Sequence, residues 1–283
     1  MNSNTIQERQ NDEALLKIQY AARSKFNSAE RFNRFAWIAC IISEFSMFLP
    51  SGWPVYILNG IPFVADFLAF IFSAITLNQV GWASRLRKYF DAYVINIQLD
   101  QFSETELRDI REETEKIYLR NSSDAAVQMA NTGNDSPPGV RDWYTFSRFY
   151  DGIEAQFECQ RQNTWWNSKM VKVRLITTSI FFFLVVGIFL FFLLNNNWLN
   201  VLLCSIGIII KSCERVIENW KYLRISHKID GAQEALEDHP IKEGVVRLQN
   251  LIDERRSINV LELGWLHNKL ANKLSKVYNK LAS

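Results

Sequence analysis

The feature that most constrains this chain is a long stretch, residues 175–210, without a single charged side chain. A helix needs about 20 apolar residues to cross the roughly 30 Å hydrocarbon core of a bilayer. Residues 175–194 satisfy this length alone, and the Asn-Asn-Asn run at 195–197 is a natural turn. The pattern predicts a hairpin of two transmembrane helices, the second with a short apolar run at 198–210.

A second, weaker hairpin is predicted closer to the amino terminus. Two apolar runs, residues 35–49 and 63–77, flank a turn with the sequence Pro-Ser-Gly-Trp-Pro. Pro62 can start or kink the returning helix, because proline fits the first turn of a helix and disrupts its interior. Together the two hairpins predict four passes through a membrane.

The basic residues beside the predicted helices indicate an orientation. Each inner flank carries Lys or Arg, whereas neither outer turn does, and basic loops remain in the cytoplasm. The first 34 residues are polar and charged and show no cleavable signal. Both termini and residues 81–174 are therefore predicted to be cytoplasmic. The basic flanks are Arg31, Arg34, Arg85, Arg87, Lys88, Lys169, Lys172, Arg174, Lys211 and Arg215.

The predicted fold class is an all-α membrane protein with two transmembrane helical hairpins and a cytoplasmic helical region. Ser103 and Glu106 have the spacing of a capping box, which opens a helix. The polar stretch 121–139 contains prolines and glycines and is expected to be a loop. Leucines recur every three or four residues over 263–281, which predicts a helix with a partner. The predicted parts are a cytoplasmic N-terminal helix (1–34), transmembrane hairpin 1 (35–80), a cytoplasmic helical region (81–174), transmembrane hairpin 2 (175–212) and cytoplasmic C-terminal helices (213–283).

Composition argues against several other classes of protein. The formal net charge of +2 is too close to neutral to indicate a nucleic-acid surface. The four cysteines form no CxxC pair and the three histidines are scattered, so neither a disulfide framework nor a zinc site is indicated. The sequence has no glycine-rich phosphate loop and no GxSxG nucleophile motif. We therefore expect no enzyme activity, no cofactor and no metal.

Four short motifs give the chain a resemblance to a known family. They are IQERQN at 6–11, FDAYV at 90–94, PGVRDWY at 138–144 and CQRQNTWWNSKMVKVR at 159–174. On these motifs the chain resembles the S-4TM family, pore-forming effectors with four transmembrane helices that are found beside cyclic-oligonucleotide synthases in bacterial antiphage defence. The resemblance covers most of the chain up to about residue 230.

The resemblance implies a function in abortive infection. A phage-activated nucleotidyltransferase makes a cyclic oligonucleotide, and the effector senses this second messenger and permeabilises the bacterial inner membrane, so that the infected cell stops growing. The implied partners are the lipid bilayer, the cyclic nucleotide and further copies of the chain in a homo-oligomer. Two other functions fit the membrane pattern: a constitutive small-ion channel or transporter, and a membrane scaffold protein.

Basic and aromatic residues indicate where a cyclic nucleotide could bind. Such a ligand needs cations for its phosphates and flat side chains for its bases. Arg161 and Trp165 would lie one helical turn apart, within reach of a cation–π contact. The alternative interpretation of this segment is a basic and aromatic belt at the membrane interface. The hypothetical ligand-binding residues are Arg141, Trp143, Tyr144, Arg148, Arg161, Asn163 and Trp165.

Four charged residues are candidates for a pore or gate. Glu44 lies roughly 13 Å into the first apolar run, and Asp66 lies in the second. A carboxylate inside a membrane is energetically costly and often marks a functional site. Lys211 and Glu214 share a helix face with Arg215 at the cytoplasmic mouth of the fourth pass. The alternatives are that Glu44 accepts hydrogen bonds within the bundle, that Asp66 lies at the outer interface, and that Lys211 extends to the membrane boundary.

Overall fold

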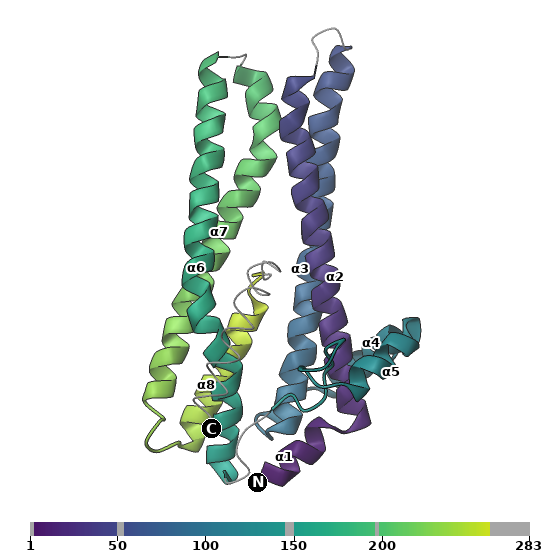
Figure 1. The fold of residues 1–283 in the computed structure, drawn as a ribbon, viewed down its shortest axis with the longest axis vertical. Helices are drawn as coiled ribbons and strands as arrows, with labels where there is room; N and C mark the ends of the chain where they lie inside the picture. The colour runs from purple at the N-terminus through teal and green to yellow at the C-terminus, as the bar shows by residue number, and fades with distance from the viewer. Residues whose placement is uncertain (1–2, 50–53, 145–149, 196–197, 261–283) are drawn as a thin grey trace.

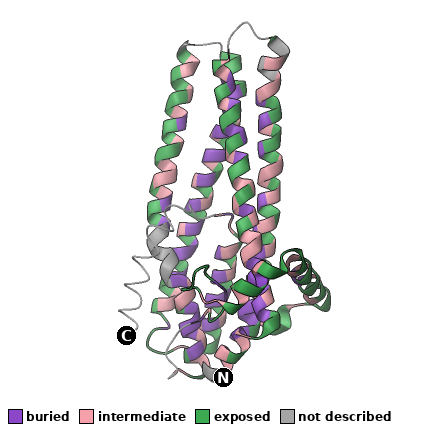
Figure 2. Cartoon of the chain, turned by 45° about the vertical axis from the view of Figure 1, so that its right-hand side comes forward, coloured by how far each residue is buried: buried purple, intermediate pink, exposed green. Residues whose placement is uncertain are grey.

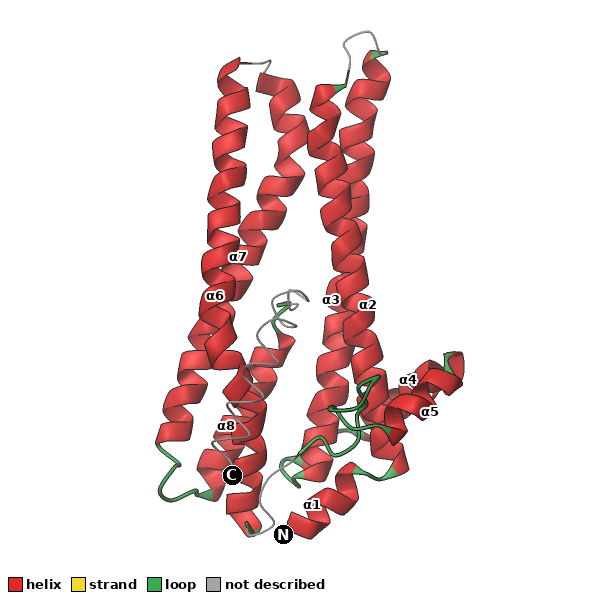
Figure 3. Cartoon of the chain, in the orientation of Figure 1, coloured by secondary structure: helices red, strands yellow, loops and turns green. Residues whose placement is uncertain are grey.

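The structure is a computed structural model that describes residues 3–49, 54–144, 150–195 and 198–260. Within these ranges the regular structure is helical, apart from one isolated bridge between Thr132 and Arg141 (Figure 3). This confirms the all-helical prediction. The elements are α1 (Ser3–Gln10), α2 (Glu13–Phe45), η1 (Ser46–Phe48), α3 (Val55–Val94), η2 (Leu99–Gln101), α4 (Glu104–Arg120), α5 (Ser122–Ala130), α6 (Gly152–Asn195), α7 (Trp198–Glu234) and α8 (Lys242–Ser257).

Four long helices, α2, α3, α6 and α7, run along the length of the molecule (Figure 1). Helices α2 and α3 form one antiparallel pair, and α6 and α7 form the other. Proline is absent from α2, α6 and α7, so these helices continue from their polar into their apolar residues without a break. Pro62 lies inside α3, which begins at Val55, two turns earlier than the proline.

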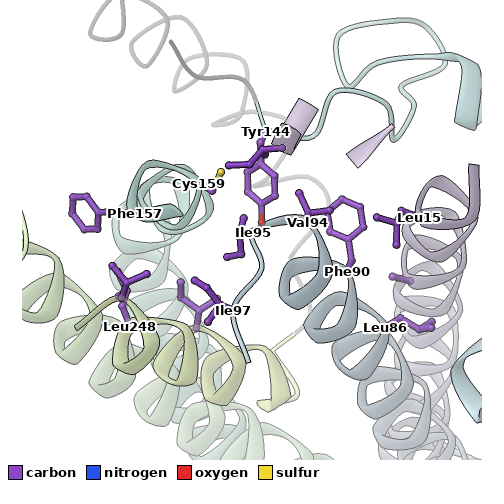
Figure 4. Close-up of a cluster of buried hydrophobic side chains, with 14 of the residues drawn as sticks. Leu15, Leu86, Phe90, Val94, Ile95, Ile97, Tyr144, Phe157, Cys159 and Leu248 are labelled. Carbon is purple, nitrogen blue, oxygen red and sulfur yellow. The ribbon is translucent and has the colours of Figure 1, made fainter. Parts of the chain in front are cut away.

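The shorter helices α1, α4, α5 and α8 gather around one end of the long helices, which we call the base (lower end in Figure 1). A cluster of buried apolar side chains holds the base together, and Figure 4 shows part of it. Leu15 of α2, Leu86 and Phe90 of α3, Phe157 of α6 and Leu248 of α8 all belong to this cluster. The base is therefore one hydrophobic core, built from segments that are far apart in the sequence.

Burial differs between the base and the other end of the molecule (Figure 2). The upper half, defined here as residues 35–80 and 175–212, has a much smaller cluster of buried apolar side chains between its helices: Ala39, Cys40, Ala69, Val185 and Ile208. Large apolar side chains face outward instead. Phe63 is 75% exposed and Phe183 is 70% exposed. An outer surface of this kind is compatible with lipid and not with water.

The capping box predicted for α4 is present. The Ser103 hydroxyl accepts a hydrogen bond of 3.3 Å from the backbone N–H of Glu106, and the Glu106 carboxylate accepts one of 3.0 Å from the backbone N–H of Ser103. The helix begins at Glu104, as this motif requires. The leucine pattern at 263–281 lies outside the described residues.

The structure corrects one expectation. The stretch 121–139 is not a loop throughout, because Ser122–Ala130 form α5. Its small polar residues occupy the first turn of a helix, where serine and an acidic side chain such as Asp124 are favourable. Tertiary contacts complete the helix, since Ala125 is fully buried and Asp124 accepts a hydrogen bond of 3.0 Å from the hydroxyl of Tyr20.

Candidate functional site

A buried carboxylate, Asp91 of α3, lies at the centre of a polar cluster in the base. The hydroxyl of Tyr144 and Nη1 of Arg256 each donate a hydrogen bond of 2.6 Å to it, and Nε2 of Gln249 donates one of 3.4 Å. A buried charge is costly unless it is both paired and hydrogen-bonded. Asp91 meets both conditions, and it thereby links α3 to α8 and to the segment that carries Tyr144.

Tyr144 is held from three sides. The side-chain amide of Gln10 pairs with its backbone, accepting from the N–H at 2.7 Å and donating to the carbonyl at 3.2 Å. Nδ2 of Asn163 donates to its hydroxyl at 2.8 Å, and its ring stacks on Phe90 with centroids 6.4 Å apart. Burial and the neighbouring Asp91 carboxylate raise the pKa of Tyr144 well above its usual value. The phenol therefore remains a hydrogen-bond donor throughout the physiological pH range.

These contacts bring together all four motifs noted in the sequence. Gln10 belongs to the motif at 6–11, Asp91 to that at 90–94, Tyr144 to that at 138–144 and Asn163 to that at 159–174. Each motif contributes one side chain to the network around Asp91, which we call the hub.

Trp143 lies at the rim of the hub. Its indole N–H donates to Oδ1 of Asn163 at 3.4 Å, and Nε2 of Gln162 donates to its backbone carbonyl at 3.1 Å. The guanidinium of Arg87 lies 4.0 Å from the centroid of the indole, in cation–π geometry. Burial and the nearby guanidinium of Arg256 lower the pKa of Arg87 to about 10. Arg87 nevertheless remains charged at neutral pH.

The segment before Trp143 is fixed by a close approach of two backbones. A Cβ atom on Gly139 would lie 1.8 Å from the carbonyl oxygen of Asn131, so only glycine fits here. Nη1 of Arg23 donates to the carbonyls of Pro138 and Gly139 at 2.8 and 3.0 Å. This explains the Pro-Gly pair that begins the third motif, because both residues lie where α2 holds the segment.

The structure separates the predicted ligand-binding residues. Trp143, Tyr144 and Asn163 contact one another in the hub. Arg141 is exposed, and Arg161 faces away from Asn163 in an ion pair of 2.9 Å with Glu158. The remaining predicted residues, Arg148 and the side chain of Trp165, lie outside the described residues.

Sequence reasoning missed the residues that the hub depends on most. Asp91 stands beside Phe90 on a buried helix face, which is a local sign that could have singled it out. Arg256 and Asp253 gave no such sign, because only the fold brings α8 to α3. Asp253 accepts a hydrogen bond of 3.4 Å from Arg256, and burial raises the pKa of its carboxyl to about 6.

A second set of polar groups lies in the upper half, between α2, α3 and α7. Oε2 of Glu44, Oδ1 of Asp66 and Oγ of Ser205 are buried, and none forms a hydrogen bond of normal length among the described residues, although Ser205 lies close to Glu44 and Ser43 lies close to Asp66. Gly207 of α7 lies against Asp66, since a Cβ atom there would be 2.2 Å from the carboxylate oxygen. The two predicted intramembrane carboxylates therefore lie in one interface, which we call the polar seam.

Lys211 continues the seam toward the base. Its side chain is buried between the helices, and Nζ donates a hydrogen bond of 2.7 Å to the hydroxyl of Ser73 on α3. The side chain therefore ends against α3 and not in solvent. Glu214, its predicted neighbour in a gate, is exposed.

The acidic partner at this level is Glu218. Arg215 is buried and forms an ion pair of 3.2 Å with Glu218. It also donates to the Asn33 side chain at 2.8 Å and to the Asn259 carbonyl at 2.7 Å. Arg215 therefore joins α7 to α2 and to the segment after α8, just where the upper half meets the base.

A family model for the SMODS-associating 4TM effector domain matches residues 4–282. The chain belongs to this effector family. The match confirms the resemblance drawn from the four motifs. No curated protein and no solved structure is significantly similar to the chain. The family is one of membrane effectors of SMODS-associated antiphage signalling, and it is not a known enzyme family.

The effector has two helical segments that are long and apolar enough to cross a membrane within the part of the chain that the structure describes. They are residues 60–94 of α3 and 171–194 of α6. Only 22% and 6% of their most apolar windows are buried, whereas a core helix of a water-soluble protein would be mostly buried. Helices α2 and α7 have shorter apolar runs but also expose large apolar side chains, including Ile42 and Trp198. The family and these helices place the protein at a membrane.

Proposed function

We propose that this protein is a membrane effector that permeabilises the bacterial inner membrane after a cyclic nucleotide signals infection. On this proposal all four long helices cross the bilayer as two transmembrane hairpins, with both termini in the cytoplasm. The outward-facing apolar side chains of the upper half support this arrangement, because none of the residues that the structure describes covers them. The positions of Lys and Arg support the orientation, because the upper ends of the hairpins have none.

The observation that carries the proposal is the polar seam. Glu44 and Asp66 present buried carboxylate oxygens without hydrogen-bond partners at an interface that faces lipid on its outer side. Such groups are costly in a membrane and are retained where they serve a purpose. If the interface between the hairpins opens, these carboxylates and Lys211 would line a path for ions. Further copies of the chain would enlarge that path in a homo-oligomer.

We propose that the hub holds the resting arrangement. It links the start of the chain, α3, α6 and α8 through Asp91, so the inner ends of both hairpins are tied together. Binding of a cyclic nucleotide to the base would have to change these contacts in order to move the hairpins. Arg141, Trp143 and Arg161 remain the candidates from the sequence for direct contacts with the nucleotide.

The test is ion flux across liposomes that contain the purified protein. We expect little flux at rest and rapid flux after the matching cyclic nucleotide is added. Glu44→Gln and Asp66→Asn should change ion selectivity while leaving insertion intact, because they neutralise the seam and keep its shape. Glu214→Gln is the matched control, since this side chain is exposed. Flux without a nucleotide would indicate a constitutive channel, and no flux under any condition would indicate a scaffold.

A further inference from the structure

A polar groove of about 660 Å³ lies beside the hub, between α2, α3, α4 and α5. The groove runs along α2 from Tyr20, in the base, to Phe32, just before the first predicted transmembrane segment begins at residue 35. Binding sites for small molecules in proteins usually have volumes of about 300–1,000 Å³. The groove is thus large enough for an organic ligand and opens where the base meets the membrane surface.

The charge of the groove favours an anion. Four basic and two acidic side chains line it, for a formal charge of +2. Both acidic groups already have partners: Glu113 forms an ion pair of 2.5 Å with Lys25, and Asp124 accepts from Tyr20. The basic side chains are Lys25, Arg31, Lys116 and Arg120.

Two of these cations are available to a ligand. Arg31 and Arg120 are exposed, and neither forms an ion pair with any residue that the structure describes. A guanidinium binds two phosphate oxygens at once through parallel N–H donors. Two free guanidinium groups on facing helices are therefore suited to one or two phosphate groups.

The remaining surface suits the rest of such a ligand. Oε1 of Gln128 is buried in the wall without a hydrogen-bond partner among the described residues, so it can accept from a ligand N–H or O–H. The half-buried ring of Phe32, 6.1 Å from that of Phe72, offers an apolar surface at the membrane end. One wall is thus polar and one end is apolar.

We propose that this groove binds a phosphodiester. This inference rests on the proposed function and names the place where a phosphate-bearing signal would act. The same chemistry occurs in an anionic phospholipid headgroup at the membrane surface and in a dissolved cyclic oligonucleotide. A larger cavity of about 930 Å³ near η2 lacks this character, because its one acidic residue, Asp100, balances its one basic residue, Lys242.

A ligand in the groove would act on the hub through α5 and the segment that follows it. Gln128 lines the groove, and its backbone carbonyl accepts a hydrogen bond of 2.8 Å from the N–H of Val140. Four residues later, Tyr144 contacts Asp91. A shift of α5 toward a bound phosphate would therefore pull directly on the segment that completes the hub.

The test uses the full chain in nanodiscs of phosphatidylcholine. In one arm, cyclic dinucleotides and cyclic triadenylate are titrated and binding is measured by calorimetry. In the other arm, phosphatidylglycerol replaces part of the lipid and the gain in thermal unfolding temperature is measured. The groove variant is Arg31→Gln with Arg120→Gln. Its control is Arg34→Gln with Arg111→Gln, which removes the same charge from the same two helices outside the groove.

We expect one probe to bind to the parent protein, and the groove variant to bind it about ten- to a hundred-fold more weakly, while the control changes less than about two-fold. The responding probe identifies the source of the phosphodiester. The inference is overturned if neither probe binds, if the groove variant binds like the parent, or if the control loses as much as the groove variant. Parallel flux measurements separate the two proposals: nucleotide-triggered flux that the groove variant retains rejects only this inference, and groove binding without flux rejects only the proposed function.

Discussion

The hub in the base and the polar seam in the upper half treat their buried carboxylates in opposite ways. In the base, Asp91 is fully buried and has hydrogen bonds from three side chains. In the upper half, Glu44 and Asp66 each leave a buried oxygen without a partner among the described residues. A fully satisfied network specifies one arrangement, whereas unsatisfied groups favour any rearrangement that gives them partners. The comparison indicates that the hub holds its segments in one arrangement, whereas the carboxylates of the polar seam favour a rearrangement.

The largest expected effect is in the base. Replacing Asp91 with alanine would leave the buried Arg256 with only its longer contact of 3.4 Å to Asp253, which we expect to cost about 3–5 kcal/mol of stability. Thermal unfolding in detergent measures this loss. Asp100→Ala removes an exposed carboxylate from the next turn of the chain and should change stability little. Equal effects of the two substitutions would show that the buried contacts of Asp91 do not stabilise the base.

In the upper half, we expect a smaller loss that a second change reverses. Gly207→Ala places a methyl group 2.2 Å from the Asp66 carboxylate, and such overpacking costs about 1–3 kcal/mol. Asp66→Ala removes the carboxylate with which the new methyl group clashes, so the double variant should regain most of the stability that Gly207→Ala loses. Unfolding of both single variants and the double variant gives the coupling directly. Strictly additive losses would mean that α3 and α7 are not in contact here.

The stability of the protein should depend on pH because the ionised carboxylate of Asp253 is buried. Its pKa in the folded protein, about 6, is above the unfolded value, so the stability it contributes is present below about pH 4 and is lost as pH rises through about 6. The parent should therefore gain about 1 kcal/mol between pH 7 and pH 5 relative to Asp253→Asn, which lacks this titration. Chemical unfolding at several pH values compares the two proteins. Parallel pH profiles would show that Asp253 is not desolvated in this way.

The smallest effect is expected at Arg161. Arg161 is half exposed in its ion pair with Glu158 and lysine keeps the charge, so Arg161→Lys should cost less than about 1 kcal/mol. The same variant tests direct contact with a nucleotide, because lysine lacks the two-pronged donor of arginine. Binding titrations should show no change if the groove between α2 and α4 is the site. A large loss of binding would indicate that the nucleotide binds instead to the face of α6 that carries Arg161.

Features encoded by neighbouring residues could be predicted from the sequence. The capping box of Ser103 and Glu106 and the long helix that begins before residue 175 depend on residues a few positions apart. The helix at Ser122–Ala130 was missed because small polar residues fit both a loop and the first turn of a helix. The burial of Ala125, which decides between them, depends on the rest of the fold.

The hub could not be predicted, because its contacts join residues that are distant in the sequence. The partners of Asp91 are 53, 158 and 165 positions away, at Tyr144, Gln249 and Arg256. Of the seven residues that the basic and aromatic pattern at 141–165 grouped as a hypothetical ligand site, Trp143, Tyr144 and Asn163 contact one another in the hub. The pattern could not show that Tyr144 would be buried, since burial depends on Gln10 and Phe90.

Because α6 is long, a small change of its tilt at the hub moves its outer end by a larger distance. Helix α6 is a single helix of 44 residues, and Asn163, which bonds to Tyr144, lies near its inner end. From there to Asn195 the rod is about 48 Å long, at a rise of about 1.5 Å per residue. A tilt of about 5° would then displace the outer end by about 4 Å, more than the width of a water molecule. A small tilt at the contacts in the base can thus become a larger movement at the outer end of α6, because the helix continues without a hinge.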